Sequence, residues 1–69
     1  MEYADFLRLV ASTWPHDLRY GQHWFNVLYC VRPNIANDIR ATPLDPFHRD
    51  GVSEETQEYV RTHWTTEQG

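Results

Sequence analysis

Histidine side chains offer the first possible chemistry in this sequence, because imidazole rings bind metals and transfer protons. The four histidines are His16, His23, His48 and His63, and each falls on a separate segment. Metal-binding helices commonly carry two histidines four positions apart on one face, and no pair here has that spacing. We therefore predict no metal site and no cofactor.

Cys30 is the only cysteine in the chain, so neither an intramolecular disulfide nor a cysteine-based zinc site can form. A reactive thiol needs positive neighbours and exposure to solvent. Cys30 stands in the apolar run at residues 27–31, which predicts a small buried hydrophobic residue instead. We predict no catalytic residue and no enzymatic activity, with a small metal-dependent or thiol enzyme kept as an alternative.

Arginine beside aromatic residues is the third pattern, since a guanidinium group stacks on rings and pairs with carboxylates or phosphates. Every basic side chain other than histidine is an arginine. One interpretation is internal pairing, of Arg40 with Asp38, Asp45 or a helix end. Arg19 would pair in the same way with Asp17 or a carbonyl. The other interpretation is a surface that binds a partner, and its candidate residues are Arg19, Tyr20, Arg32, Arg40 and His48.

The formal net charge is -4, from ten acidic and six basic side chains. A protein that binds nucleic acid through phosphates needs concentrated positive charge, so this balance disfavours a nucleic-acid partner. Glu54, Glu55 and Glu58 form an acidic face on the last predicted helix. That face is either solvated or contacts a basic partner surface.

The length of 69 residues predicts one small domain, whose ten aromatic residues supply much of the apolar area that so short a chain can bury. The first residues, MEYADF, show no basic region followed by an apolar run, so we expect no signal peptide. No apolar run reaches the roughly 18 residues that cross a bilayer. We expect no membrane association and a cytoplasmic location, in the host cytoplasm if the protein is phage-encoded.

Apolar residues at helical spacing, interrupted by prolines, predict three main helices and one short helix. The main helices are expected at residues 2–13, 20–32 and 54–64, and the short helix at 33–41. A strand at residues 27–31 is the alternative for part of the second helix, because that run is rich in strand-forming residues.

Single residues around these helices have specific expected roles. Gly21, in the first turn of the second helix, would let another backbone come close. The Asn26 amide would hold the loop at residues 43–47. Asp45 would cap a short helical turn from which Phe47 folds back onto the helices. The hydroxyl of Ser53 would cap the last helix.

The predicted fold is therefore an all-α single-domain bundle, with residues 1–64 as an ordered core and residues 65–69 as a frayed tail. The second helix should lie between the first and the last. The predicted core residues are Val10, Trp24, Phe25, Leu28, Val31, Ile35, Ile39, Phe47, Val60 and Trp64.

Residues 19–47 carry a set of short motifs. They are R-Y-G-Q at 19–22, F-N-x-L at 25–28, R-P at 32–33, A-x-x-I-R-x-T at 36–42 and D-P-F at 45–47. In combination they resemble a group of short, mostly uncharacterised proteins of bacteriophages and bacteria, in which an acidic residue stands at the position of Asn34. The resemblance implies a small phage-type or bacterial accessory protein and brings no established activity.

Phage proteins of this size often bind a host enzyme or defence complex and block it, and the resemblance makes that a prior expectation. We predict a non-enzymatic protein-binding module, phage-derived, that modulates or inhibits a host protein complex by occluding a surface. Its partner would be a host or bacterial protein. A small protein that associates with nucleic acid is the alternative from another class, and a homodimer stays open because three tryptophans are many for one small core.

Overall fold

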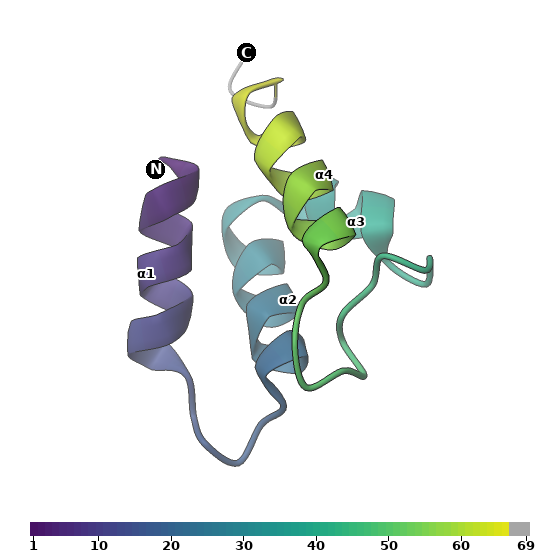
Figure 1. The fold of residues 1–69 in the computed structure, drawn as a ribbon. Helices are drawn as coiled ribbons and strands as arrows, with labels where there is room; N and C mark the ends of the chain where they lie inside the picture. The colour runs from purple at the N-terminus through teal and green to yellow at the C-terminus, as the bar shows by residue number, and fades with distance from the viewer. Residues whose placement is uncertain (67–69) are drawn as a thin grey trace.

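The computed structural model describes residues 1–66, which form four α-helices and no strand (Figure 1). The helices are α1 (Tyr3–Thr13), α2 (Tyr20–Val31), α3 (Pro33–Ile39) and α4 (Glu54–Thr66). The predicted all-α fold, with three main helices and a short one, is confirmed. The strand alternative for residues 27–31 is wrong, because these residues complete α2 and bury one of its faces.

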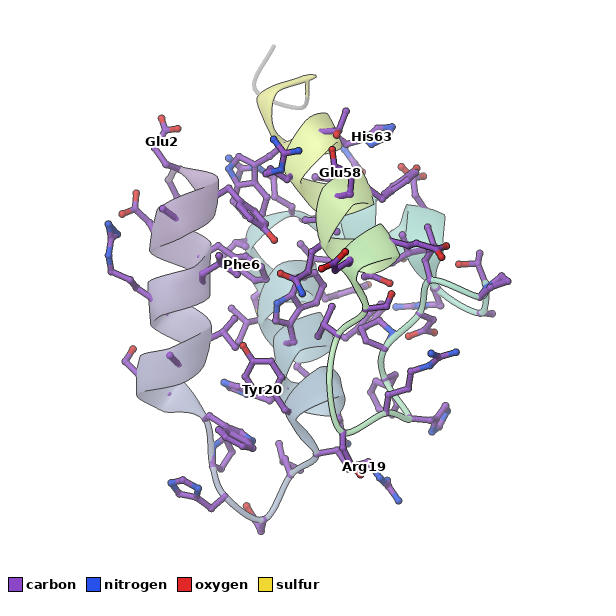
Figure 2. The ribbon with its side chains drawn as sticks, in the orientation of Figure 1. Glu2, Phe6, Arg19, Tyr20, Glu58 and His63 are labelled. Carbon is purple, nitrogen blue, oxygen red and sulfur yellow. The ribbon has the colours of Figure 1, made fainter. Side chains whose placement is uncertain are left out.

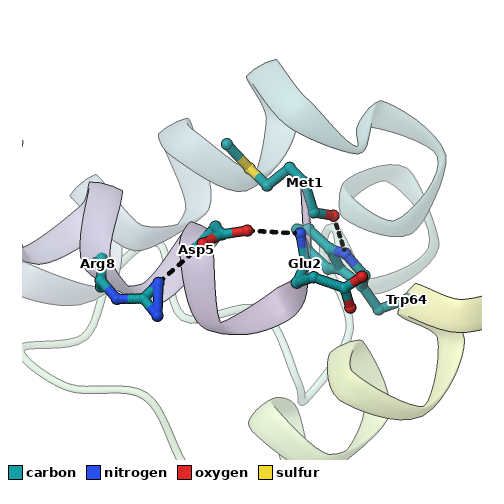
Figure 3. A network of polar contacts seen from close by, with 5 residues as sticks. All are labelled: Met1, Glu2, Asp5, Arg8 and Trp64. Atoms are coloured by element: carbon teal, nitrogen blue, oxygen red, sulfur yellow. Dashed lines mark hydrogen bonds and ion pairs between the residues drawn. The ribbon is translucent and has the colours of Figure 1, made fainter.

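The two ends of α1 follow from local chemistry. At its start, a carboxylate oxygen of Asp5 accepts a hydrogen bond of 3.0 Å from the backbone N–H of Glu2, which satisfies a donor that a helix start leaves unpaired. The Arg8 guanidinium donates to the other oxygen at 2.8 Å (Figure 3). At its end, Pro15 disfavours helical geometry at the preceding residue, and Trp14 is extended.

A single residue separates α2 from α3. Arg32, at φ -143° and ψ 71°, leaves helical geometry before Pro33, so α2 ends one residue earlier than predicted. Pro33 is the first residue of α3, where a proline costs no hydrogen bond because that N–H has no partner in a helix.

The prediction that the short helix reaches residue 41 is wrong by two residues. Arg40 is extended, with ψ 132°, and Ala41 has a positive φ of 59°. The N–H of Ala41 donates to a carboxylate oxygen of Asp45 at 2.8 Å. This side-chain acceptor holds the chain in a turn that ends α3 before Thr42 and Pro43.

The loop between α3 and α4 passes directly over the start of α2. Gly21 donates its N–H to the carbonyl oxygen of Arg49 at 3.1 Å. A Cβ at this position would lie 2.5 Å from that oxygen and within contact distance of the carbonyl oxygen of Pro46 as well. The predicted close approach of another backbone at Gly21 is therefore confirmed.

Helix α4 begins as predicted, because the Ser53 hydroxyl accepts the N–H of Thr56 at 3.2 Å. Thr56 is buried, and its hydroxyl donates to the carbonyl oxygen of Leu44 at 2.6 Å. The helix continues to Thr66, two residues beyond the predicted end at residue 64. The rest of the predicted tail, residues 67–69, lies outside the described residues.

The core is organised around aromatic rings. The Phe6 ring lies between Trp24 and Trp64, with ring centres 5.1 and 5.2 Å away, and Figure 2 shows Phe6 pointing from α1 toward the interior. Tyr3 contacts the Trp64 ring edge-to-face at 5.6 Å. Trp14, the third tryptophan, is half-buried and donates its ring N–H to a backbone carbonyl. The exposed tryptophan that would have favoured a homodimer is therefore not found.

Eight of the ten predicted core residues are buried, and the other two, Val31 and Phe47, are only half-buried at the edge of the core. Phe6 and Ala36 are buried and were missing from the prediction. Phe6 has helical spacing to Val10 on α1, whereas Ala36 is small and its burial depends on how closely α3 packs.

Helix α2 packs against both α1 and α3, and α4 packs against α3 (Figure 1). The second helix was predicted to lie between the first and the last. It does pack against α1, but its main partner on the other side is α3 rather than α4. The ends of the fold also meet. The indole N–H of Trp64 donates to the carbonyl oxygen of Met1 at 2.9 Å (Figure 3).

Candidate functional site

An open groove of about 570 Å³ lies between α2, the end of α3 and the loop that follows α3. We call it the aromatic groove and define it by its lining residues, which are Phe25, Asn26, Tyr29, Cys30, Arg40, Asp45, Phe47 and His48. It combines three aromatic rings with a guanidinium, a carboxylate, an imidazole and a thiol. The groove therefore offers both apolar and hydrogen-bonding groups for recognition.

The outer face of α2 forms one wall of the groove. Trp24 and Leu28 are fully buried, which turns Asn26, Tyr29 and Cys30 outward, since residues three and four positions apart share a helical face. Tyr29 is 43% exposed, an unusual exposure for so large a ring in so small a fold. The wall therefore offers an aromatic surface to solvent.

Arg40 lies over this wall. Its guanidinium carbon is 5.1 Å from the centre of the Tyr29 ring and 6.0 Å from that of Phe25, within the range of cation–π attraction. Arg40 forms no ion pair with any residue from 1 to 66. The predicted internal pairing of Arg40 with Asp38 or Asp45 is wrong, because the ring faces take the place of a carboxylate.

Asp45 braces the loop that forms the opposite wall. One carboxylate oxygen accepts the N–H of Ala41 at 2.8 Å, and the other accepts the N–H of Phe47 at 2.9 Å. Asp45 thus accepts backbone N–H groups, but the prediction that it caps a turn of helix is wrong. The segment forms a turn, closed by the N–H of Arg49 on the carbonyl oxygen of Pro46, rather than the predicted turn of helix.

Phe47 folds back from this turn, as predicted. Its ring meets Phe25 edge-to-face at 6.0 Å, and the exposed His48 ring contacts Phe47 at 5.1 Å. Phe25 is 5% exposed, so its ring forms the floor of the groove beside Phe47. The floor is apolar and the rim is polar.

The structure brings two of the five predicted partner-binding residues together, Arg40 and His48, in the aromatic groove. Arg19 is exposed at the start of α2, where its side chain lies 3.7 Å from Asp50 rather than pairing with Asp17 (Figure 2). Tyr20 is half-buried and packs edge-to-face on Trp14 at 5.1 Å. Neither residue lines the groove.

Arg32, the fifth predicted residue, is engaged inside the fold. Its guanidinium lies 4.6 Å from the centre of the Trp64 ring and donates to the carbonyl oxygens of Val31 and Met1 at 2.9 and 3.3 Å. We call this cluster of Met1, Arg32 and Trp64 the N-terminal clamp. It joins the chain start to α4, so Arg32 has a structural role.

Cys30 is exposed, which contradicts the prediction of a buried hydrophobic residue. The neighbouring residues in sequence are apolar, but the helix turns Leu28 inward and Cys30 outward. Among the described residues, no group of three or more histidine, cysteine or acidic side chains is arranged to hold a metal ion.

His23 is buried, and its role is structural. Its Nε2 lies 3.1 Å from both the carbonyl oxygen of Val10 and the hydroxyl of Thr13. Because a carbonyl can only accept, Nε2 carries the proton and donates. The ring thereby satisfies a carbonyl at the end of α1, and that carbonyl has no partner within the helix.

Asn26 does not hold the loop in the way predicted. It is exposed and lines the aromatic groove. The loop is fastened instead by the backbone of Gly21 and by the hydroxyl of Thr56. The helical turn places Asn26 two residues beyond Trp24 and therefore away from the packed side of α2.

The acidic face of α4, formed by Glu54, Glu55 and Glu58, borders a second hollow of about 560 Å³ together with Leu44 and Tyr59. The side chain of Glu58 pairs with the Arg61 guanidinium, which lowers the pKa of that carboxyl below its ordinary value. Glu54 and Glu55 lie in the first turn of the helix, where negative charge stabilises the helix dipole. This face has a structural explanation.

Groups with shifted pKa values on α1 are also explained by packing and helix ends. Burial raises the pKa of Tyr3 above 10.0. The backbone N–H of Glu2, and then the Arg8 guanidinium, lower the pKa of Asp5 below 3.8. These residues lie outside the aromatic groove.

Tyr29 was absent from the predicted partner-binding residues, and the groove as a whole was not predicted. Asn26 and Cys30 are four positions apart and therefore share one face of α2. The polar side chain of Asn26 indicated that this face is not packed. The opposite wall could not be found in this way, because it depends on a loop that returns to α2 from twenty residues further along the chain.

We compared the chain with models of protein families, with curated proteins and with solved structures, and none of the three comparisons finds a match. The part of the chain that the structure describes contains no helix long and apolar enough to cross a membrane.

Proposed function

We propose that this chain is a non-enzymatic protein-binding module and that the aromatic groove is its contact surface. The observation that carries the proposal is the exposed Tyr29 ring with the Arg40 guanidinium stacked on it. Tyrosine and arginine are enriched among the residues that dominate binding energy at protein interfaces. Stacking also restricts both side chains before binding, which lowers the entropy cost of ordering them in a complex.

The architecture of the groove supports a protein partner. An apolar floor of Phe25 and Phe47 is surrounded by polar groups from Asn26, Arg40 and His48. Protein interfaces have the same arrangement of an apolar centre and a polar rim. The groove is open to solvent rather than enclosed, so it suits contact with a surface or a segment of another protein.

We further propose that the partner is a host or bacterial protein complex, which the module inhibits by covering a surface. The motif resemblance of residues 19–47 to short phage and bacterial proteins supports this step. In the structure, the motif residues meet in space: Gly21 contacts the loop that carries Asp45 and Pro46, and Phe47 contacts Phe25. Five of the eight lining residues belong to the motifs, as expected if the groove is what the group has in common, whereas Tyr29, Cys30 and His48 lie outside them.

A pull-down from nuclease-treated bacterial lysate, read by mass spectrometry, tests this function. The tagged wild-type protein should retain one protein in stoichiometric amount. The double variant Tyr29→Ala, Arg40→Ala should lose it, and the control Arg8→Ala, on the exposed surface of α1, should keep it. Retention of the same protein by the groove variant would contradict the proposal, and binding that disappears with nuclease would favour nucleic acid.

A further inference from the structure

We propose that the aromatic groove binds an acidic peptide segment of its partner, with a carboxylate on Arg40 and a neighbouring apolar side chain on the floor of Phe25 and Phe47. This inference rests on the proposed function and specifies the chemistry of the ligand.

The geometry of Arg40 favours a carboxylate. The guanidinium carbon lies over the Tyr29 ring, 5.1 Å from its centre, and the N–H donors of arginine point outward in the plane of the group. Those donors match the two oxygens of a carboxylate in a bidentate pair. Since Arg40 forms no ion pair with a described residue, its charge is free to pair with a ligand.

The negative charge already in the groove is occupied. Both oxygens of Asp45 accept backbone N–H groups, from Ala41 and from Phe47. One lone pair of each oxygen is therefore already used, which leaves Asp45 fewer sites for a basic ligand. The groove thus offers a cation with no ion-pair partner and an anion whose hydrogen-bonding capacity is partly used, which favours an acidic ligand over a basic one.

An apolar side chain next to the acidic one would use the rest of the groove. Phe25 and Phe47 meet edge-to-face, and Tyr29 continues the aromatic surface toward solvent. Burying an aliphatic or aromatic side chain there removes apolar surface of both partners from water. The motif we expect is one aspartate or glutamate adjacent to one large apolar residue.

A peptide fits this surface better than a nucleic acid. A bound strand tracks a positively charged groove along several phosphates, but Arg40 is the only arginine among the lining residues and Asp45 lies beside it. The net charge of -4 adds long-range repulsion, which is largely screened beyond about 8 Å at physiological salt. A single carboxylate that pairs with Arg40 at close range is little affected by this long-range repulsion.

Selection from a library of random peptides, displayed on their encoding messenger RNA, tests the ligand class. The targets are the wild-type protein, Arg40→Gln, and the control Arg8→Gln. Peptides enriched on the wild type and the control, but not on Arg40→Gln, should carry an acidic residue beside a large apolar one. Thermal melting of each variant checks that it is folded. Arg40→Lys keeps the charge without the planar donors and should recover only part of the enrichment.

The most enriched peptide then allows a quantitative test by fluorescence anisotropy. Replacing its acidic residue by the amide should weaken binding about tenfold on the wild type, as for the loss of a charged hydrogen bond. The same replacement should have no further effect on Arg40→Gln, because the pairing group is already absent. Equal weakening on both proteins would show that the carboxylate binds elsewhere and would overturn the inference.

The selection separates failure of this inference from failure of the proposed function. Enrichment of neutral or basic peptides on the wild type and the control, but not on Arg40→Gln, would refute the acidic ligand and leave the binding module standing. If no peptide is enriched on the wild type relative to Arg40→Gln, and the wild type binds a single-stranded oligonucleotide, both the acidic ligand and the protein-binding function are refuted. Concentration-dependent self-association that Arg40→Gln abolishes would identify a second copy as the occupant and would also overturn the inference.

Discussion

Gly21 sets how closely the loop that builds the groove approaches α2. Its N–H donates to Arg49, and the space where a side chain would begin is filled by the carbonyl oxygens of Pro46 and Arg49. These are backbone atoms, so they can move away only if the loop moves as a whole. The position therefore requires glycine for reasons of space.

The variant Gly21→Ala should lower the free energy of unfolding by about 1–3 kcal/mol, because forcing atoms into a filled site displaces backbone. Chemical denaturation measures this change. Gly51→Ala is the matched control, since a Cβ there meets nothing within 4 Å, and it should be neutral or slightly stabilising. Equal effects of the two variants would contradict the packing of the loop against α2.

Ala41 occupies the left-handed region that favours glycine, with φ 59°. A non-glycine residue in this region costs about 1–2 kcal/mol of folding free energy. Glycine avoids this cost, but it also raises the conformational entropy of the unfolded chain, which offsets part of the gain. Ala41→Gly should therefore stabilise the protein by about 0.5–1 kcal/mol. Ala11→Gly, on the exposed face of α1, should destabilise it by about 1 kcal/mol. Thermal melting of both variants tests the sign of each change.

Helix α4 is joined to the groove loop by Thr56. Its hydroxyl donates to Leu44 and accepts from the hydroxyl of Ser53 at 3.0 Å. Thr56→Val keeps the volume and removes both bonds, leaving a carbonyl without its partner in a partly buried place. Denaturation should show a loss of about 1–3 kcal/mol.

Thr56→Ser is the companion variant for this contact, because it keeps the hydroxyl and loses only the buried methyl group. It should retain the hydrogen bond to Leu44, which a backbone amide spectrum of the loop would report. If the valine variant proved as stable as the wild type, the contact between α4 and the loop would not be a stabilising one.

The first turn of α1 gives the protein a defined dependence on pH. The folded state lowers the pKa of Asp5 below 3.8, so the charged carboxylate stabilises the fold above the unfolded pKa. This contribution is lost as the pH falls through the folded pKa. Asp5→Asn should lower the melting temperature at neutral pH, and the difference from the wild type should shrink below about pH 4.

Asp17→Asn, in the exposed loop after α1, is the charge-matched control for this pH dependence. It should leave the melting temperature close to that of the wild type across the same range. A difference between Asp5→Asn and the wild type that stays constant down to strongly acidic pH would contradict the role of the charge.

At the scale of the whole molecule, the helices were predictable because their signals are local. Apolar spacing and the positions of Pro15 and Pro33 placed α1 and α2 to within one residue at each end. The end of α3 was missed because the turn at Ala41 depends on a hydrogen bond to the Asp45 side chain. The helix propensity of Ala41 alone does not reveal that bond.

The groove was less predictable, because its walls come from segments far apart in sequence. The run at residues 27–31 is apolar, so Cys30 looked buried. Only the packing of Trp24 and Leu28 decides which face of the helix turns outward. Arg40 and His48 were chosen for their chemistry. What brings them together is the return of the loop over Gly21, a contact between residues about thirty positions apart.

The N-terminal clamp closes the fold by fixing its first residue to its last helix. Trp64 donates to Met1 (Figure 3), and Arg32 covers the Trp64 ring. Arg32 is thus engaged in the clamp, whereas Arg40 is exposed over an aromatic wall. That distinction is the basis for choosing Arg40 as the binding residue.

The most direct test of the groove as a binding surface uses Cys30, the only thiol, which is exposed in its wall. The thiol is labelled with a benzophenone photocrosslinker, and the protein is incubated with lysate and irradiated. The control places the same label on Ser12→Cys, at the exposed end of α1, in a Cys30→Ser background. The proposed function predicts that the Cys30 label either crosslinks one partner protein or blocks its capture, whereas the control captures it without a crosslink. Capture of that partner by the Cys30-labelled protein with no crosslink would contradict the assignment of the groove.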